Sequence, residues 1–370
     1  MVIKDLVKNL WGFSTRRKIV AFAVDDYGNV RLDSKKARDR LESAGVKPKN
    51  RFDAFDTLET TEDLEALFDV LRSAKDKNGH HAVFTPYSLP CNLDFESLKA
   101  NHYAGYTYET LDQTFEKLAN IHAKEYAGAW TLWKQGISEG IFIPQFHGRE
   151  HLNIKIFESE LHNNNPQLLI NLQNRSLTTF KSINSPNLLW TAAFSFWDRD
   201  ETKKFPEILK TGTEAFKKVF GYPSLTFTPP ASHFPVWLES ELPKYGIRYL
   251  DKSIIKKQHL GNGRFRFELN YLGKKIHPKL KVQTRNVVFE PTSGYGDSIE
   301  SCIQQMSAAF SLNKPVIISS HRVNFCGLIE EKNRKKGLSD LKILLNKIIS
   351  KWPDVEFMSI SDLLNGLSND

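Results

Sequence analysis

The sequence feature that most constrains the fold is a series of short apolar runs, each ending in a polar or turn residue. Most of these runs are continuous rather than alternating, which is typical of strands buried on both faces. They are KIVAFAV (18–24), HAVFTPY (81–87), IFIPQF (141–146), LTFT (225–228), IRYL (247–250), VVFEP (287–291), VIISS (316–320) and VEFMSI (355–360).

Segments with a helical pattern separate these runs. Thr61 opens one of them with an acidic first turn, and Leu64 and Leu71 then fall on one face. The others span 108–135, 201–220, 297–312 and 338–351. Strands that alternate with helices predict an α/β fold, a parallel sheet covered by helices. We expect one domain over residues 1–370, with a helical insertion at about 101–140, a hairpin-like insertion at about 252–285 and a loop over 162–175.

Composition excludes several classes of protein. No stretch approaches the ~20 apolar residues of a membrane-spanning helix. The first residues carry charges where an export signal has its apolar core, so we expect a cytoplasmic protein. Cys91, Cys302 and Cys326 lie far apart, which excludes a disulfide framework and a zinc ribbon. The net charge is +8, but basic and acidic residues are interspersed, which indicates a solvated surface and no nucleic-acid partner.

Four predicted strands are followed by residues that could take part in catalysis or ligand binding. They are Asp25-Asp26, His147 with His151, Pro229-Pro230, and His321. Adjacent carboxylates repel each other, so the pair either caps a turn or lies beside a cation. Histidines at i and i+4 share one face if the segment is helical, which suits one metal ion, although such pairs also arise by chance. His321 is either a capping residue or a functional one. The shared position at strand ends favours a site, because functional groups of α/β barrels collect there.

Taken together, these motifs resemble those of the polysaccharide deacetylase family, the NodB-homology carbohydrate esterases of family 4. The similar segments, in order, are Ala23-Val24-Asp25-Asp26-Tyr27-Gly28, Ala82-Val83-Phe84-Thr85, His147 with His151, Pro229-Pro230, Gly246 to Asp251, Ile318-Ser319-Ser320-His321 and Phe357 to Ser361. The resemblance extends from about residue 18 to 364. It implies a distorted (β/α) barrel of about seven parallel strands with helical and hairpin insertions.

The resemblance also implies an activity, namely removal of acetyl groups from N-acetylated or O-acetylated sugars or polysaccharide. It assigns Asp26, His147 and His151 to a divalent metal ion. Zinc suits this donor set best, and other first-row ions also fit. It assigns Asp25 to the general base and His321 to the general acid. Aromatic residues that could stack on sugar rings, although each is more often a core residue, are Trp130, Trp133, Trp197 and Trp237.

Two departures from the family pattern leave an alternative open. The segment ahead of Pro229 has no arginine to steady the base, and Arg322 follows His321 where the family has an aspartate. A non-catalytic relative of the same fold that binds carbohydrate or metal is therefore the alternative function. A serine nucleophile is disfavoured, because there is no GxSxG motif and Ser320 precedes His321 on the same strand.

Overall fold

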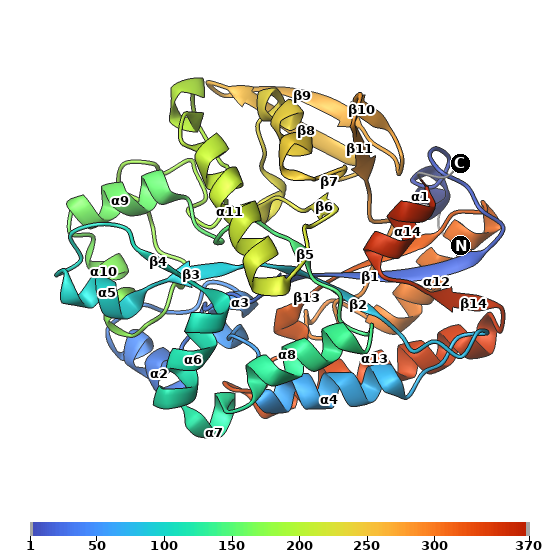
Figure 1. Ribbon diagram of the computed structural model, residues 1–370, viewed down its shortest axis with the longest axis horizontal. Helices are drawn as coiled ribbons and strands as arrows, with labels where there is room; N and C mark the ends of the chain where they lie inside the picture. The colour runs from blue at the N-terminus through green and yellow to red at the C-terminus, as the bar shows by residue number, and fades with distance from the viewer. Residues whose placement is uncertain (1–2, 368–370) are drawn as a thin grey trace.

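The computed structural model describes residues 3–367 and has an α/β fold (Figure 1). Its main sheet has 10 strands in the order β10-β11-β7-β6-β5-β2-β1-β13-β12, and β14 pairs with β1 beside this path. The strands are β1 Lys18–Tyr27, β2 Phe84–Ser88, β5 Gln145–Phe146, β6 Thr226–Phe227, β7 Tyr249–Asp251, β10 Lys275–His277, β11 Leu280–Gln283, β12 Val287–Val288, β13 Val316–His321 and β14 Val355–Phe357.

The pairing confirms the predicted parallel sheet. Each neighbouring pair is parallel except β10 and β11, which are antiparallel. Strands β10 and β12 lie at the two ends of the strand order, and within residues 3–367 no pairing joins them. The predicted barrel is therefore open between these two strands.

Strand β1 lies in the middle of the sheet, and all of its residues after Lys18 are buried. Burial on both faces explains why its sequence is a continuous apolar run. The register aligns Asp25 of β1 with His321 at the end of β13, and Phe146 of β5 with Phe227 of β6. Because these strands are parallel, their carboxyl ends meet at one edge of the sheet, where the polar motifs follow them.

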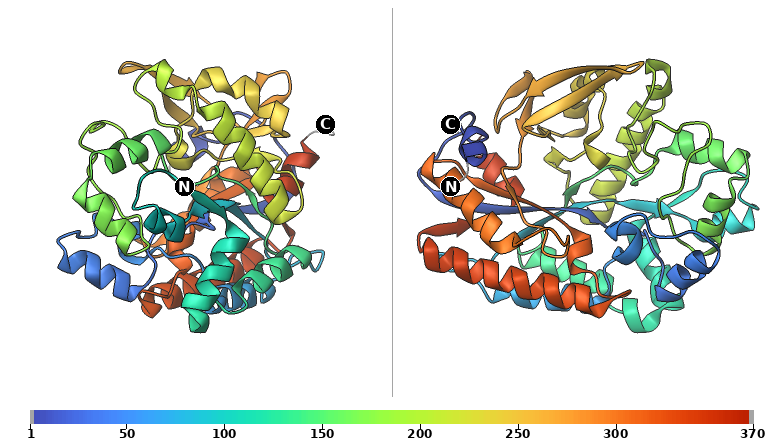
Figure 2. Two further views of the ribbon diagram at one scale, coloured as in Figure 1. Left: turned by 60° about the vertical axis from the view of Figure 1, so that its left-hand side comes forward. Right: turned by 180° about the vertical axis from the view of Figure 1, so that it is seen from behind.

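Helices cover the sheet. Helices α4 Thr61–Arg72, α8 Ala129–Ser138 and α13 Glu331–Lys351 lie together below β1 in Figure 1, and α12 Ser298–Ser311 lies beside α13 in the view from behind (Figure 2). The cap of α4 is Thr60 rather than the predicted Thr61, because Thr60 and Asp63 form a reciprocal capping box. The buried face of α4 includes Leu64 and Leu71 and joins the main hydrophobic core.

Two segments predicted as insertions have structure of their own. Residues 101–140 contain the short strand β4 Tyr108–Thr110, which pairs with β3 Cys91–Leu93, followed by three helices. These helices are α6 Leu111–Ile121, α7 Ala123–Tyr126 and α8. Residues 252–285 contain β8 Ile255–Gly261 and β9 Arg264–Leu269, an antiparallel hairpin that lies on the opposite side of the molecule from α13 in both figures.

The loop predicted over residues 162–175 is wrong, because this segment contains helix α10 Pro166–Gln173. Asn165 caps the helix by accepting hydrogen bonds from two backbone N–H groups, and Pro166 occupies the first helical position, where its missing N–H costs nothing. The Asn-Pro pair that indicated a loop is therefore a helix start. Leu168 and Leu172 are buried and lie on the inward face of this helix.

The remaining elements are helices. They are α1 Ile3–Val7, α2 Lys35–Ser43, α3 Arg51–Phe55, α5 Phe95–Ala100, α9 Ile154–His162, α11 Phe205–Phe220, α14 Ile360–Gly366, and the 3-10 helices η1 Arg199–Thr202, η2 Pro230–Ser232, η3 Val236–Tyr245 and η4 Arg322–Phe325. Among residues 3–367, no helix combines the length and the apolar character that crossing a membrane requires. The cysteines are buried free thiols.

Arg322, one of the two departures from the family pattern, is buried behind the end of β13. Its guanidinium contacts Asp56 (Nη2 to Oδ1, 2.9 Å) and Glu59 (Nη1 to Oε2, 3.0 Å), and all three side chains are buried. Burial raises the pKa of Asp56 to about 6, even though the charge of Arg322 acts in the opposite direction. Arg322 is therefore the counter-charge of two buried carboxylates.

Replacing this counter-charge should destabilise the fold strongly. We expect Arg322→Met to lower the free energy of unfolding by about 3–5 kcal/mol, because it leaves two buried carboxylates without a cation. Arg72→Met, which breaks the partly exposed pair with Glu139, should cost only about 0–1 kcal/mol. Urea unfolding of the two variants measures the difference. Equal and small losses would contradict this role for Arg322.

Candidate metal and active site

The two carboxylates at the end of β1 reach the same cavity because the strand is irregular there. Asp26 has φ 74°, which is in the left-handed region, and the pairing of β1 with β2 shifts register between Val24 and Tyr27. In a regular strand consecutive side chains point to opposite faces, whereas a bulge can re-aim one of them. Both Asp25 and Asp26 line one cavity of about 380 Å³, hereafter the metal-site cavity.

His147 and His151 lie on a loop, so the condition under which their spacing would place them on one helical face is not met. His147 follows β5, Gly148 has φ 110°, and helix α9 begins only at Ile154. A Cβ at residue 148 would lie 3.1 Å from Cγ of Pro230 and would also strain the backbone. The loop nevertheless brings the two imidazoles together.

The loop directs both histidines at Asp26. The Nε2 atoms of His147 and His151 lie 3.3 and 3.4 Å from Oδ1 of Asp26. Burial would raise the pKa of Asp26, but the hydrogen bond from His147 and the nearby charge of His151 outweigh it and hold that pKa well below its usual range. Burial lowers the pKa of His151 to about 4, against the attraction of Asp26. The site therefore favours an anionic carboxylate beside a neutral His151.

This arrangement fits a divalent ion. Potential ligand atoms of Asp26, His147 and His151 all lie within 4.8 Å of one another. The Nδ1–H of His147 donates to the backbone carbonyl of Thr228 at 2.7 Å, so Nε2 is the ring nitrogen that faces Asp26 and could bind a metal ion. One carboxylate and two imidazoles suit zinc and other borderline first-row ions, and three protein ligands leave positions open for water and substrate.

A second acidic group with metal-ligand spacing holds a lysine instead. Asp94, Glu96 and Glu109 lie close together, but the Nζ atom of Lys117 is 2.8 Å from Asp94 and 3.3 Å from Glu96 and also contacts Glu109. The ammonium of Lys117 supplies the charge that a cation would bring. This cluster is a structural ion-pair network.

Arg285 holds Asp25, and the sequence analysis missed it. Its Nη1 and Nη2 atoms each lie 2.7 Å from an oxygen of Asp25, while Nε lies 2.6 Å from Asp251. Nη2 also donates to the hydroxyl of Thr228, the residue before Pro229. Arg285 comes from the connection between β11 and β12. The segment ahead of Pro229 contains no arginine, but Arg285 reaches the same place from another part of the chain.

His321 is held by Glu290, a second residue that the sequence analysis missed. Nδ1 of His321 donates to Oε1 of Glu290 at 2.6 Å, and Nε2 lies 3.9 Å from Oδ2 of Asp25. Arg51 and Asn324 in turn bind Glu290. Burial lowers the pKa of His321, but the hydrogen bond and the charge of Glu290 outweigh it and raise that pKa to about 9. His321 is therefore protonated at neutral pH, with Nε2 toward Asp25.

The charge of Glu290 should set the alkaline limit of any reaction that needs protonated His321. A raised pKa keeps the acid form present up to about pH 9 and loses it above that pH. We expect Glu290→Gln to move the alkaline limb of the kcat/KM profile down by at least about one pH unit, because one opposite charge shifts a pKa by about 1–3 units. The pH dependence of kcat/KM in both proteins measures this. A limb that does not move would contradict the role of Glu290.

The rest of the metal-site cavity combines polar groups with two aromatic rings, those of Phe52 and Trp190. Trp190 lines it, whereas none of the four tryptophans singled out from the sequence does. Of those four, Trp133 is fully buried, and Trp197 is 42% exposed and lines a different cavity. Other residues lining the metal-site cavity are Asn29, Arg31, Asn50, Thr179, Thr191, Pro229 and Ser232. Hydrogen-bonding groups beside an aromatic ring suit a sugar.

Comparison with known proteins yields structural neighbours only. No protein-family model matches the sequence, and no curated protein matches it. Among solved structures, a putative polysaccharide deacetylase from Mycobacterium smegmatis is 13% identical, with 97% of this chain and 93% of that chain covered and a TM-score of 0.45. A probable polysaccharide deacetylase from Pseudomonas aeruginosa PAO1 is 9% identical, with 95% and 91% covered and a TM-score of 0.44.

An enzyme with a different activity is equally similar. The 4-alpha-glucanotransferase from Thermococcus litoralis is 10% identical, with 94% of this chain and 40% of that chain covered and a TM-score of 0.45. Polysaccharide deacetylases are thus among the solved structures that the chain resembles. With TM-scores below 0.5, this similarity assigns no activity, and the chemistry has to be read from the side chains.

Proposed function

We propose that the protein is a divalent-metal-dependent hydrolase that removes acetyl groups from N-acetylated or O-acetylated sugars or polysaccharide. The observation that carries the proposal is the convergence of five side chains in one cavity. Asp26, His147 and His151 form a metal-ligand set, and Asp25 and His321 lie beside it. A purely structural role does not explain why two acids and three histidines from three separate strand ends share this cavity.

The metal-ligand set would hold one ion, with zinc the best match to its donors. A divalent ion bound there lowers the pKa of water from 15.7 towards ~7 and polarises a carbonyl group. His147 contributes a fixed tautomer, because its Nδ1–H is bound to Thr228. Asp26 contributes a negative charge, which offsets the free-energy cost of burying a doubly charged cation.

Asp25 is placed to act as the general base. Arg285 holds both of its oxygens, which fixes the carboxylate, and each oxygen keeps a further lone pair for a proton. The attacking water gives its proton to Asp25 and its oxygen to the acetyl carbon. Arg285 is a positioning residue, because it acts on the reaction only through Asp25.

His321 is placed to act as the general acid. Glu290 keeps its imidazole protonated at neutral pH and turns Nε2 toward Asp25. When the bond between the acetyl carbon and the sugar nitrogen breaks, the nitrogen takes the proton from Nε2. The products are acetic acid and a free amino sugar, and return of the proton from Asp25 to His321 restores both groups, so atoms and charges balance.

The experiment measures acetate released from N-acetylated and O-acetylated oligosaccharides by the zinc-loaded protein and by His321→Ala. We expect the variant to keep its metal and to lose about 10²–10⁴-fold in rate on an N-acetyl sugar, the usual range for a lost general acid. It should lose much less on an activated acetate ester, whose leaving group needs no proton. Equal losses on both substrates would contradict the role of His321.

The same assay decides between the enzyme and the alternative from the sequence. Acetate release from any of these sugars supports the hydrolase. A protein that binds one ion and releases no acetate from any of them would instead be a non-catalytic relative that binds carbohydrate or metal.

A further inference from the structure

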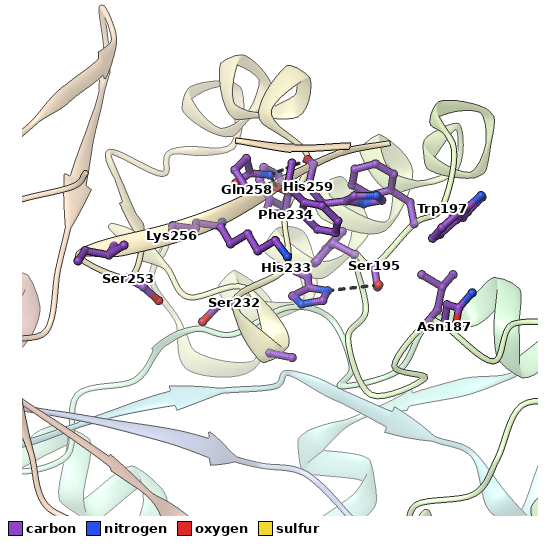
Figure 3. Close-up of a pocket in the computed structure, with 17 residues that line it drawn as sticks. Asn187, Ser195, Trp197, Ser232, His233, Phe234, Ser253, Lys256, Gln258 and His259 are labelled. Atoms are coloured by element: carbon purple, nitrogen blue, oxygen red, sulfur yellow. Dashed lines mark hydrogen bonds between the residues drawn. The ribbon is translucent and has the colours of Figure 1, made fainter. Parts of the chain in front are cut away.

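Beside the metal-site cavity lies a cavity of about 280 Å³, hereafter the second cavity. Figure 3 shows the residues that line it. Ala231 and Ser232 line both cavities, so they form a shared wall. Both have backbone angles in the left-handed region, with φ 53° and 59°, which is uncommon for residues other than glycine. Residues of strand β8, which belongs to the hairpin, also line the second cavity. The two cavities therefore lie side by side, as binding sites for neighbouring units of one saccharide would.

Lys256 of β8 brings an unpaired amine into the second cavity. The residue is 8% exposed, and its Nζ has no hydrogen bond or ion pair with any residue between 3 and 367. Figure 3 shows its side chain running across the cavity toward His233. The nearest carboxylates are already engaged, because Lys252 lies 2.7 Å from Glu239 and 2.8 Å from Glu268.

The charge of Lys256 is costly in this place. Burial, and then repulsion from Lys252, lowers the pKa of Lys256 to about 8. The amine is still mostly protonated at neutral pH. The nearly buried cation is attracted by Glu239, Glu268 and Asp251, but these carboxylates pair directly with Lys252 and Arg285. An anion bound in the cavity would offset that cost.

The other residues of the second cavity suit an anionic saccharide. No carboxylate lines it, while Lys257, His233 and His259 do. His233 Nδ1 lies 3.2 Å from the hydroxyl of Ser195, so its ring is held in place. At the rim, Trp197 and Phe265 are 42% and 48% exposed and offer apolar faces to a sugar ring.

We propose that the second cavity binds a carboxylate or phosphate group of the substrate, on a sugar unit next to the acetylated one, with Lys256 as its counter-charge. The inference rests on the proposed function, because it places the acetylated unit at the metal site. It narrows the substrate class to acidic saccharides. Lys256 acts as a specificity residue and takes no part in the hydrolysis.

The test is calorimetric binding to the full-length, zinc-loaded protein with three probes. These are a tetrasaccharide of alternating N-acetylglucosamine and glucuronate, an N-acetylglucosamine tetramer with a 6-phosphate on one inner unit, and the unmodified, neutral N-acetylglucosamine tetramer. The wild type should bind at least one anionic probe about tenfold or more tightly than the neutral one, as a charge-assisted hydrogen bond would give. The preferred anionic probe tells carboxylate from phosphate.

Two variants show whether Lys256 is the cause. Lys256→Met should abolish the preference for the anion, keep the bound zinc and not lower the melting temperature, since it removes an unpaired buried charge. Lys279→Met removes an exposed lysine from the same part of the chain and should leave the preference unchanged. Equal affinity of the wild type for all probes, or equal effects of the two variants, would overturn the inference.

The outcomes for this inference and for the proposed function are separate. An anion preference that depends on Lys256, without acetate release from any probe, would reject the hydrolase and keep the anion site. Acetate release from the neutral tetramer, without any anion preference in binding, would keep the hydrolase and reject the anion site.

Discussion

Asp26→Asn should abolish both metal binding and activity. Oδ1 of Asp26 is the atom that the Nε2 atoms of His147 and His151 both approach, at 3.3 and 3.4 Å. An amide keeps the shape of the side chain but removes the negative charge that favours a dication. Because even indirect partners of a ligand cost about 10–100-fold in metal affinity, we expect a loss of more than ~100-fold here. Metal content after dialysis, measured by elemental analysis, tests this.

Asp94→Asn is the matched control for this change. Asp94 belongs to the other group with metal-ligand spacing, but Lys117 occupies that group. The control should keep one ion per chain. An Asp26→Asn protein that also kept one ion per chain would show that the metal, if any, lies elsewhere.

Asp25→Asn should separate the base from the metal. Asp25 contacts Arg285 and lies near His321, whereas the two metal-ligand histidines approach Asp26. We expect the variant to keep its zinc and to lose about 10²–10⁴-fold in kcat, the range for a lost general base. Arg285 still pairs with Asp251, so the fold should hold. Metal content and acetate release, measured on the same sample, test this.

The adjacent position of the two aspartates makes this prediction easy to contradict. If Asp25→Asn came out metal-free while Asp26→Asn kept its ion, the two residues would exchange roles. If both variants kept metal and full activity, neither aspartate would belong to the site.

The sequence predicted the parts of the site that follow buried strands. Asp25, Asp26 and His321 end long apolar runs, and parallel strands place such ends at one edge of a sheet. His147 was found by the same rule, through β5. His151 was found through its spacing from His147, although the helix assumed for that spacing is a loop around Gly148.

Glu290 lies near the end of the apolar run 287–291, so the same rule could have pointed to it, whereas Arg285 could not be found in this way. Each belongs to an irregular segment beside the two-residue strand β12, and each reaches the site only through the tertiary fold. No local pattern connects residue 285 with residue 25, or residue 290 with residue 321. The positive φ of Asp26 could not be predicted from the sequence either, because the bulge that produces it depends on how β1 pairs with β2.

The two departures from the family pattern have different physical explanations. The arginine missing ahead of Pro229 has a spatial counterpart in Arg285, which binds both Asp25 and Thr228. Arg322 is the counter-charge of Asp56 and Glu59 inside the protein, so its place after His321 serves the fold. Neither departure removes a side chain from the set that lines the metal-site cavity.

Titration of the metal-stripped protein with zinc, followed by acetate release from an N-acetylated oligosaccharide, tests the central claim most directly. The site formed by Asp26, His147 and His151 predicts that activity is absent without metal, rises linearly with added zinc and saturates at about one ion per chain. Undiminished acetate release from the metal-free protein, or none at saturating zinc from any acetylated sugar, would contradict it.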